Sequence, residues 1–172
     1  MATLTLQTLR IPVPELGAVC LAASPFGVVR VQLGDDMERF RRELAQARPD
    51  AEIGGSGPVV RRAAKAIADY LAGGPDPKVP VVLPEDGFQA RVWREIARIP
   101  RGSVRSYGAI AKALRRPGAP RAVGQACGAN PVPILVPCHR VVRTGGALGG
   151  FGADLRWKRH LLKLEGLEFP SE

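Results

Sequence analysis

The chain has 172 residues, enough for one large domain or two small ones, and no apolar run is long enough to span a membrane. Its three cysteines are an odd number without a CxxC spacing, and its first residues do not resemble a signal peptide. We therefore expect a cytoplasmic protein without disulfides or a bound metal. Residues 1–79 contain 10 Lys or Arg and 9 Asp or Glu, whereas residues 80–172 contain 15 and 7. This basic second half favours a polyanionic partner, nucleic acid first.

The sequence predicts a small N-terminal α/β domain at residues 1–78, whose role is structural support of the second domain. Short apolar runs separated by turn residues indicate three strands, at residues 3–10, 18–23 and 27–33. Asp35 or Asp36 should cap a first amphipathic helix, and Pro58 suits the opening of a second. Cys20 falls in an apolar strand and is interpreted as structural.

A linker rich in proline and glycine, at residues 73–80, leads to a second domain at residues 79–172. This domain is predicted to begin with a short strand at residues 79–83. A helix follows, with Asp86 and Gln89 at the spacing of a capping box. The expected fold class is therefore α/β (α+β), with a mostly helical second domain.

Two helices joined by a tight turn are predicted at about residues 106–128, as in a helix-turn-helix. Ser106 should cap the first helix, and Pro120 should open the second. The second helix has few long hydrogen-bonding side chains, chiefly Arg121 and Gln125, and is otherwise small and smooth. Because readers of the major groove rely on such side chains, this helix suits a DNA backbone or the minor groove. On spacing alone, an ordinary packed pair of helices explains the pattern equally well.

Residues 130–142 place a cysteine, Cys138, beside a histidine, His139, behind three prolines. Prolines fix φ and restrict the residue before them, so we expect residues 130–137 to form a stiff, extended segment. This segment would present Cys138 as a nucleophile. The alternative is a buried strand in which the cysteine only packs, but an apolar strand has no use for His139 and Arg140.

A cysteine reacts as the thiolate, and the base that forms it must be His139 or His160. The base is usually oriented by a third group, for which Asp154 and Glu165 are the nearest carboxylates. Adjacent residues on a strand face opposite sides, so Cys138 and His139 cooperate only if the strand ends there or a water bridges them. On the residues alone, several Cys-His enzymes remain open, including a hydrolase.

Five glycines among residues 144–152 indicate a flexible loop that forms a lid or one wall of a pocket. A closing helix follows. Its inner face is predicted to consist of Trp157, Leu161 and Leu164. Lys158 and the arginines beside it are most simply a solvated face of this helix.

Four short sequence motifs follow one another in the second domain. They are Arg-Ala-Val-Gly at 121–124, Asn-Pro at 130–131, Pro-Cys-His-Arg-Val-Val at 137–142 and Leu-Leu-Lys-Leu-Glu-Gly at 161–166. In order and spacing they resemble the O6-alkylguanine-DNA alkyltransferases, over about residues 88–166. The first domain matches more loosely, in its length and its Ser-Pro-Phe-Gly turn.

The resemblance implies that the protein binds the minor groove, flips a base and transfers an alkyl group irreversibly to its own cysteine. Cys138 is the implied acceptor, with His139 as its base through a water and Glu165 orienting His139. Asn130 is the implied hinge that braces the thiol loop, and Tyr107 the donor toward guanine N3. The implied DNA contacts are Arg121, which fills the stack after flipping, and Ser106, Ala119, Ala122, Gly124 and Arg140. The implied base pocket is Val141, Phe151, Gly152 and Lys158.

The chain departs from the family pattern in places. Phe151 stands where the family often has tyrosine, and Gly152 with Ala153 gives a slim wall suited to larger adducts. Members that bind zinc in the first domain use Cys and His there, whereas this chain has only Cys20 before residue 139. We expect a monomer that needs no cofactor or membrane and binds double-stranded DNA containing O6-alkylguanine, and also O4-alkylthymine. The alternative is a DNA-binding lesion sensor or regulator without transfer, although relatives of that kind lack the cysteine.

Overall fold

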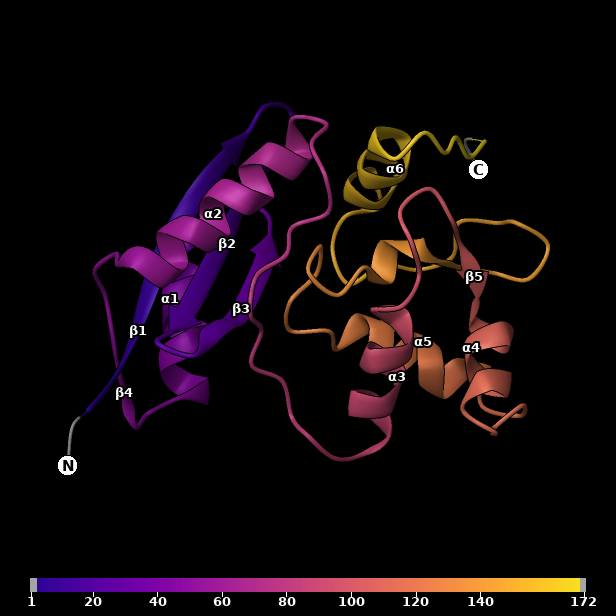
Figure 1. Cartoon of the computed structure of the whole chain (residues 1–172), viewed down its shortest axis with the longest axis horizontal. Coiled ribbons are helices and arrows are strands. Elements are labelled where there is room, and N and C mark those ends of the chain that lie inside the picture. Colours follow the sequence, from indigo (N-terminus) through magenta and orange to yellow (C-terminus); the bar gives the residue numbers. More distant parts are fainter. Residues whose placement is uncertain (1–2, 171–172) are drawn as a thin grey trace. The chain divides into compact units, whose positions relative to one another are not determined.

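The structure is a computed structural model that describes residues 3–170. The chain divides into two compact units, one ending at Val82 and the other beginning at Leu83 (Figure 1). The architecture is mixed α/β, as predicted, with the larger sheet in the first unit and mostly helices in the second. None of the helices within residues 3–170 is long and apolar enough to cross a membrane.

The sheet of the first unit has the strand order β3-β2-β1-β4. β2 (Gly17–Ser24) pairs antiparallel with β1 (Leu4–Val13) on one side and with β3 (Gly27–Leu33) on the other, which confirms the three predicted strands. β4 (Ala51–Ile53) pairs in parallel with β1. The sequence does not predict β4, because three residues within a loop rich in glycine and proline are too few to show an alternation.

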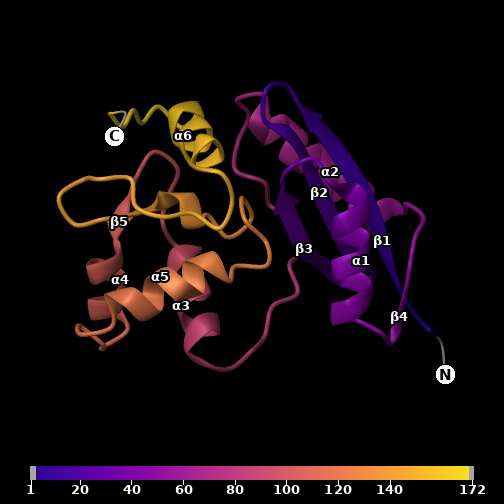
Figure 2. The same ribbon diagram turned by 180° about the vertical axis from the view of Figure 1, so that it is seen from behind.

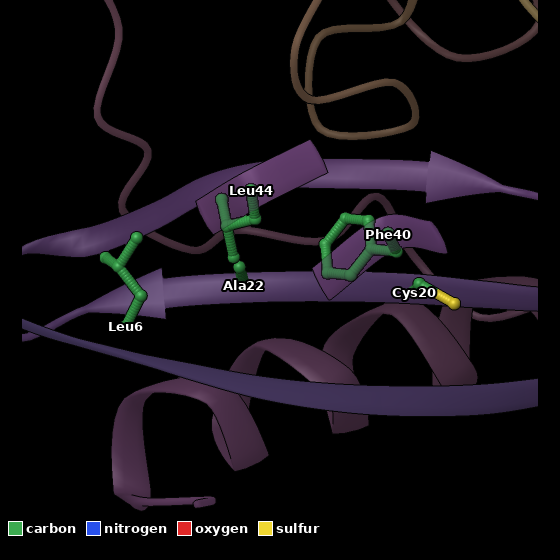
Figure 3. Close-up of a cluster of buried hydrophobic side chains, with 5 residues drawn as sticks. All are labelled: Leu6, Cys20, Ala22, Phe40 and Leu44. Carbon is green, nitrogen blue, oxygen red and sulfur yellow. The ribbon is translucent and has the colours of Figure 1, made fainter. Parts of the chain in front are cut away.

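Two helices cover opposite faces of this sheet, as Figures 1 and 2 show. α1 (Met37–Ala47) follows Asp36, whose Oδ1 accepts a hydrogen bond from Arg39 N at 2.7 Å. α2 (Pro58–Leu71) has proline at its opening, as predicted. Because both faces are covered, β2 is buried along almost its whole length. The buried cluster beneath α1 consists of Leu6, Cys20, Ala22, Phe40 and Leu44 (Figure 3), so Cys20 is a core residue.

The strand predicted at residues 79–83 is wrong. A single bridge forms there instead, in which Val28 N donates to Pro80 O at 2.9 Å and Val82 N donates to Val28 O at 2.8 Å. Proline has no N–H with which to continue a ladder, so the pairing ends after one residue.

The second unit begins with α3 (Phe88–Ile96), which follows Gly87 without a side-chain cap. The capping box predicted for Asp86 and Gln89 is therefore wrong. Gly87 occupies the capping position with a φ of 99°, which favours glycine, and glycine has no side chain with which to cap the helix. Further along α3, Trp93 Nε1 donates to Ala126 O at 2.7 Å, which joins this helix to the later helix that contains Ala126.

α4 (Tyr107–Ala113) and α5 (Pro120–Gly128) occupy the stretch in which the helix-turn-helix is predicted. Ser106 caps α4 as predicted, accepting from Ala109 N at 3.0 Å. β5 (Arg105–Ser106) pairs in parallel with β6 (Val141–Val142), which places the start of α4 beside the residues that follow Cys138. The last helix is α6 (Leu155–Leu164). Its inner residues Trp157 and Leu161 are buried as predicted, whereas Leu164 is only half-buried.

Candidate active site

The segment before the cysteine is a tight loop, so the predicted extended run at residues 130–137 is wrong. Asn130 holds this loop from within: its Nδ2 donates to Val136 O at 2.8 Å, and its Oδ1 accepts from Val132 N at 3.0 Å. Ile134 takes a left-handed backbone conformation with a φ of 74°, which is rare for a β-branched residue. The prediction fails because the hydrogen bonds of Asn130 fold the segment back, an effect that local proline preferences do not reveal.

Cys138 opens η1 (Cys138–Arg140), a single turn of 3-10 helix, so the constraint of opposite strand faces does not apply. The residue is 4% exposed. Burial raises the pKa of its thiol, while a hydrogen bond with Asn130 and the positive charge of Lys158 act in the opposite direction. Because the net shift is upward, the group is a neutral thiol near pH 7 and needs a base to become nucleophilic.

A buried charge network adjoins the cysteine. His139 Nε2 lies 2.8 Å from Glu165 Oε1. Arg140 donates to the same carboxylate, from Nε to Oε2 at 2.9 Å and from Nη2 to Oε1 at 2.7 Å. All three side chains are at most 4% exposed. Arg140 therefore does not reach a DNA phosphate, and the implied DNA contact is wrong, because its guanidinium is committed to a buried carboxylate.

The structure distinguishes between the two carboxylates that are candidates for orienting the histidine base. Glu165, directly after α6, is the one that contacts His139. Asp154 instead caps the start of α6 and accepts from Arg156 N at 2.8 Å. His160 packs edge-on against a tryptophan of the same helix. The structure thus brings His139 and Glu165 together next to Cys138, whereas Asp154 serves its own helix.

Lys158 is completely buried, so its interpretation as part of a solvated face is wrong. Its Nζ donates to Val141 O at 2.7 Å and to Gly150 O at 3.0 Å. Tyr107 Oη donates to the same Gly150 carbonyl at 3.2 Å. Burial lowers the pKa of Lys158 to about 8 and raises the pKa of Tyr107 to about 12. The two side chains together hold the glycine-rich loop against the residues that follow Cys138.

A cavity of about 640 Å³ has Cys138 in its lining. One wall comes from α5, and each of its contributing residues lies three or four positions from another, so they share one side of the helix. They are Pro120, Arg121, Gly124, Gln125, Cys127 and Gly128. The facing wall comes from Tyr107, Gly150, Phe151 and Gly152. Arg121 and Arg143 are exposed and line the same cavity, so its rim is positively charged.

Several residues with implied DNA or base contacts do not line this cavity. Val141 and Lys158 are buried and support it through backbone and ammonium contacts. Ser106 caps α4, and Ala119 precedes the first turn of α5. Ala122 is half-buried on α5.

The cavity lining also includes residues that the sequence did not predict as part of the site, among them Gln125, Cys127 and Arg143. Cys127 follows Gly124 by three positions on one helix, and this spacing is a signal from which it could have been found. Burial raises the pKa of the Cys127 thiol to about 12, so it forms an apolar part of the wall. The position of Arg143 depends on the fold and has no such local signal.

Comparison with known proteins places these features in a family. A model described as "6-O-methylguanine DNA methyltransferase, DNA binding domain" matches residues 87–167. The methylated-DNA–protein-cysteine methyltransferase of Mycobacterium tuberculosis is 51% identical over 85 residues, which are 49% of this chain and 52% of that protein. The bifunctional transcriptional activator/DNA repair enzyme Ada of Escherichia coli is 36% identical over 155 residues, 88% of this chain and 43% of that protein. A crystal structure of Mycobacterium tuberculosis OGT in complex with DNA has a TM-score of 0.74 and 34% identity, covering 94% of this chain and 92% of that one.

The fold and the site define a two-unit protein whose buried cysteine adjoins a His-Glu pair and a cavity walled by the second helix of a helix pair. The chain belongs to the 6-O-methylguanine DNA methyltransferase family, which confirms the resemblance seen in its motifs. It spans about half the length of the curated relatives it matches.

Proposed function

We propose that this protein repairs alkylated DNA by transferring the alkyl group of O6-alkylguanine in duplex DNA to Sγ of Cys138. The position of Cys138 carries this proposal, because the residue lines a cavity and adjoins the buried pair of His139 and Glu165. A relative named as a methylated-DNA–protein-cysteine methyltransferase and a relative crystallised with DNA support the same assignment.

The proposed reaction is a displacement at the alkyl carbon. The Cys138 thiol gives its proton through a water to His139, and Glu165 stabilises the resulting imidazolium. Sγ attacks the alkyl carbon, so a C–S bond forms while the C–O6 bond breaks and its electron pair leaves with guanine. Guanine then takes up one proton, with Tyr107 as the proposed donor toward N3. The thioether product is not hydrolysed as an acyl thioester would be, so each protein molecule acts once.

The alkylated base must leave the duplex stack before its O6 group can approach a thiol in a cavity. The wall formed by α5 is smooth around Gly124, and such a surface suits the minor groove. Arg121, exposed in the first turn of α5, is the proposed side chain that fills the gap left by the flipped base. The positive charge concentrated in residues 80–172 supplies affinity for phosphates.

The residues that line the cavity determine which alkyl adducts fit into it. Phe151 contributes a ring without a hydroxyl group, and Gly152 leaves a slim wall. A Cβ added at Gly152 would lie 3.1 Å from Gly128 O, so the loop and α5 approach closely because this residue is glycine. We infer that the pocket accepts O6-alkylguanine and O4-alkylthymine, and that its glycine wall leaves room for larger adducts.

Transfer of a labelled methyl group tests the proposal directly. A duplex carrying one O6-[¹⁴C]methylguanine should lose its label to the protein, up to one equivalent and no further. Peptide mapping should place the label on the peptide that contains Cys138. Cys138→Ala should take up none, whereas Cys127→Ala, which alters the other thiol of the cavity, should still be labelled. Label that remains on the DNA, or turnover beyond one equivalent, would refute the proposal, and the first outcome would favour a lesion sensor or regulator.

A further inference from the structure

Lys158 differs from every other lysine of the chain. The sequence contains five lysines, and the other four are exposed, whereas Lys158 is completely buried on α6. Removing an ammonium group from water is costly, so a buried lysine needs compensating partners. A leucine or methionine would fill the same space without that cost. The burial of this charge therefore requires a reason beyond packing.

The ammonium group of Lys158 joins two segments of the candidate site. It donates to Val141 O, three residues beyond Cys138, and to Gly150 O in the glycine-rich loop. Its Nζ also lies 5.9 Å from the centre of the Tyr107 ring, and Tyr107 donates to the same Gly150 carbonyl. One buried cation thus links the chain that carries the thiol to a wall of the cavity.

The titratable and charged groups that act on Lys158 come from four neighbouring segments. Cys138 and Cys127 face it with thiols, Tyr107 faces it with its ring, and Arg143 opposes it with a like charge. Burial is the largest influence on Lys158 and lowers its pKa to about 8, so the group is mostly an ammonium ion at neutral pH. The same positive charge lowers the pKa of Cys138, against the larger effect of burial.

We propose that Lys158 is a positioning residue for alkyl transfer, whose ammonium group holds the Gly150 loop and stabilises the thiolate that develops at Cys138. This role rests on the proposed function, because it assigns the thiolate of Cys138 to that reaction. The ammonium charge is present below pH 8 and is lost above it. Its assistance to the thiolate therefore fades as the pH rises through 8, while the thiol itself ionises further.

The test uses a small electrophile, so that thiol reactivity is measured without DNA. Lys158→Met removes the charge and retains most of the volume, and Lys163→Met removes an exposed charge from the same helix as a matched control. Iodoacetamide should alkylate Cys138 of Lys158→Met at least about tenfold more slowly at pH 7, the effect of a pKa raised by one unit. Lys163→Met should stay within about twofold of the unmodified protein. Lys158→Arg, which restores the charge, should recover part of the rate.

The pH profile separates an electrostatic role from a purely structural one. In the unmodified protein, the alkylation rate should rise less steeply above pH 8, where Lys158 loses its charge. In Lys158→Met, the profile should follow a single ionisation at higher pH. Equal rates and equal profiles for the two proteins would overturn the proposal. If the unmodified protein fails to accept a methyl group from DNA, the proposed function fails instead, and this outcome is measured separately.

The unmodified protein also provides a test that does not depend on the folding of a variant. With ¹³C-labelled lysine, one of the five side-chain signals should titrate near pH 8, well below the ordinary lysine range. The alkylation rate of Cys138 should show an inflection at the same pH. An alkylation rate that shows no inflection at the pH where the Lys158 signal titrates would refute the role of Lys158, whether or not Lys158→Met folds.

Discussion

The bidentate contact of Arg140 with Glu165 allows a quantitative prediction. Arg140→Met removes the donations to both carboxylate oxygens and the donation from Nη1 to Ile99 O at 2.7 Å. The carboxylate of Glu165 is 0% exposed, so it cannot recover its hydration when the guanidinium is lost. Breaking a buried pair by removing one partner typically costs about 3–5 kcal/mol. We expect Arg140→Met to lose unfolding free energy in this range, a large part of the stability of a small domain.

Tryptophan fluorescence during urea unfolding is a suitable assay for this change. Both tryptophans of the chain, Trp93 and Trp157, are buried in the unit that contains Arg140. The signal therefore reports the unfolding of that unit and is not confused by an independent transition of the other. Arg98→Met is the matched control, because Arg98 also pairs with a glutamate but its side chain is 76% exposed. The control should leave the unfolding free energy nearly unchanged.

A double variant distinguishes the cost of leaving the Glu165 carboxylate buried without a cation from a simple loss of packing. Replacing both partners, as in Arg140→Met with Glu165→Met, removes the buried charge together with its partner. Such replacements are often neutral or stabilising, so the double variant should be more stable than Arg140→Met alone. The reasoning is refuted if Arg140→Met loses less than about 1 kcal/mol, or if the double variant is as unstable as the sum of the two single changes.

Three further changes test local features of the fold. Ser106→Ala removes the oxygen that accepts from Ala109 N and should cost about 1 kcal/mol in urea unfolding. Asn130→Ala removes both bonds that fold the thiol loop, so it should cost about 1–3 kcal/mol and slow methyl transfer at equal protein concentration. The hydrogen bond from Arg105 lowers the pKa of Glu95 below 4.5, so its stabilisation is present above that pH and lost below it. Glu95→Gln should therefore be less stable than the unmodified protein at pH 7, and the difference should vanish toward pH 3.

The elements that the sequence predicts correctly are those whose cause is local. The three strands, the cap at Asp36, the opening of α2 at Pro58 and the cap at Ser106 follow from residues within a few positions of each other. β4 and the single bridge at Val81 depend on partners far along the chain. Local preferences therefore do not reveal β4, and they predict a strand at residues 79–83 where only one bridge forms.

The same distinction separates the parts of the candidate site. The side-by-side placement of Cys138 and His139 is visible in the sequence, but the choice between Asp154 and Glu165 required the family resemblance. In the structure that choice follows from tertiary contacts, because Asp154 is used to cap its own helix. The charge of Arg140 likewise suggests a phosphate contact until the buried carboxylate opposite it is known.

The net charge of the buried groups around Cys138 is unchanged by the proposed proton transfer. Arg140 and Glu165 offset each other, so the ammonium of Lys158 leaves one positive charge before the transfer. Movement of the thiol proton to His139 creates one anion and one cation, so the net charge of the buried region stays the same. Glu165 lies 2.8 Å from the ring that becomes positive, and the ammonium of Lys158 acts on the sulfur that becomes negative.

Each charge formed in that step therefore meets a partner that is already in place, and little reorganisation is needed at the moment of transfer. A purely apolar interior would be cheaper to fold but would oppose both new charges, because isolated ions are strongly disfavoured away from water. We infer that the unit retains three costly ionic side chains because they let a thiol ionise although it is almost completely buried. The requirement also explains why Arg140 and Lys158 belong inside the protein, although each carries a charge that would otherwise suit the DNA surface.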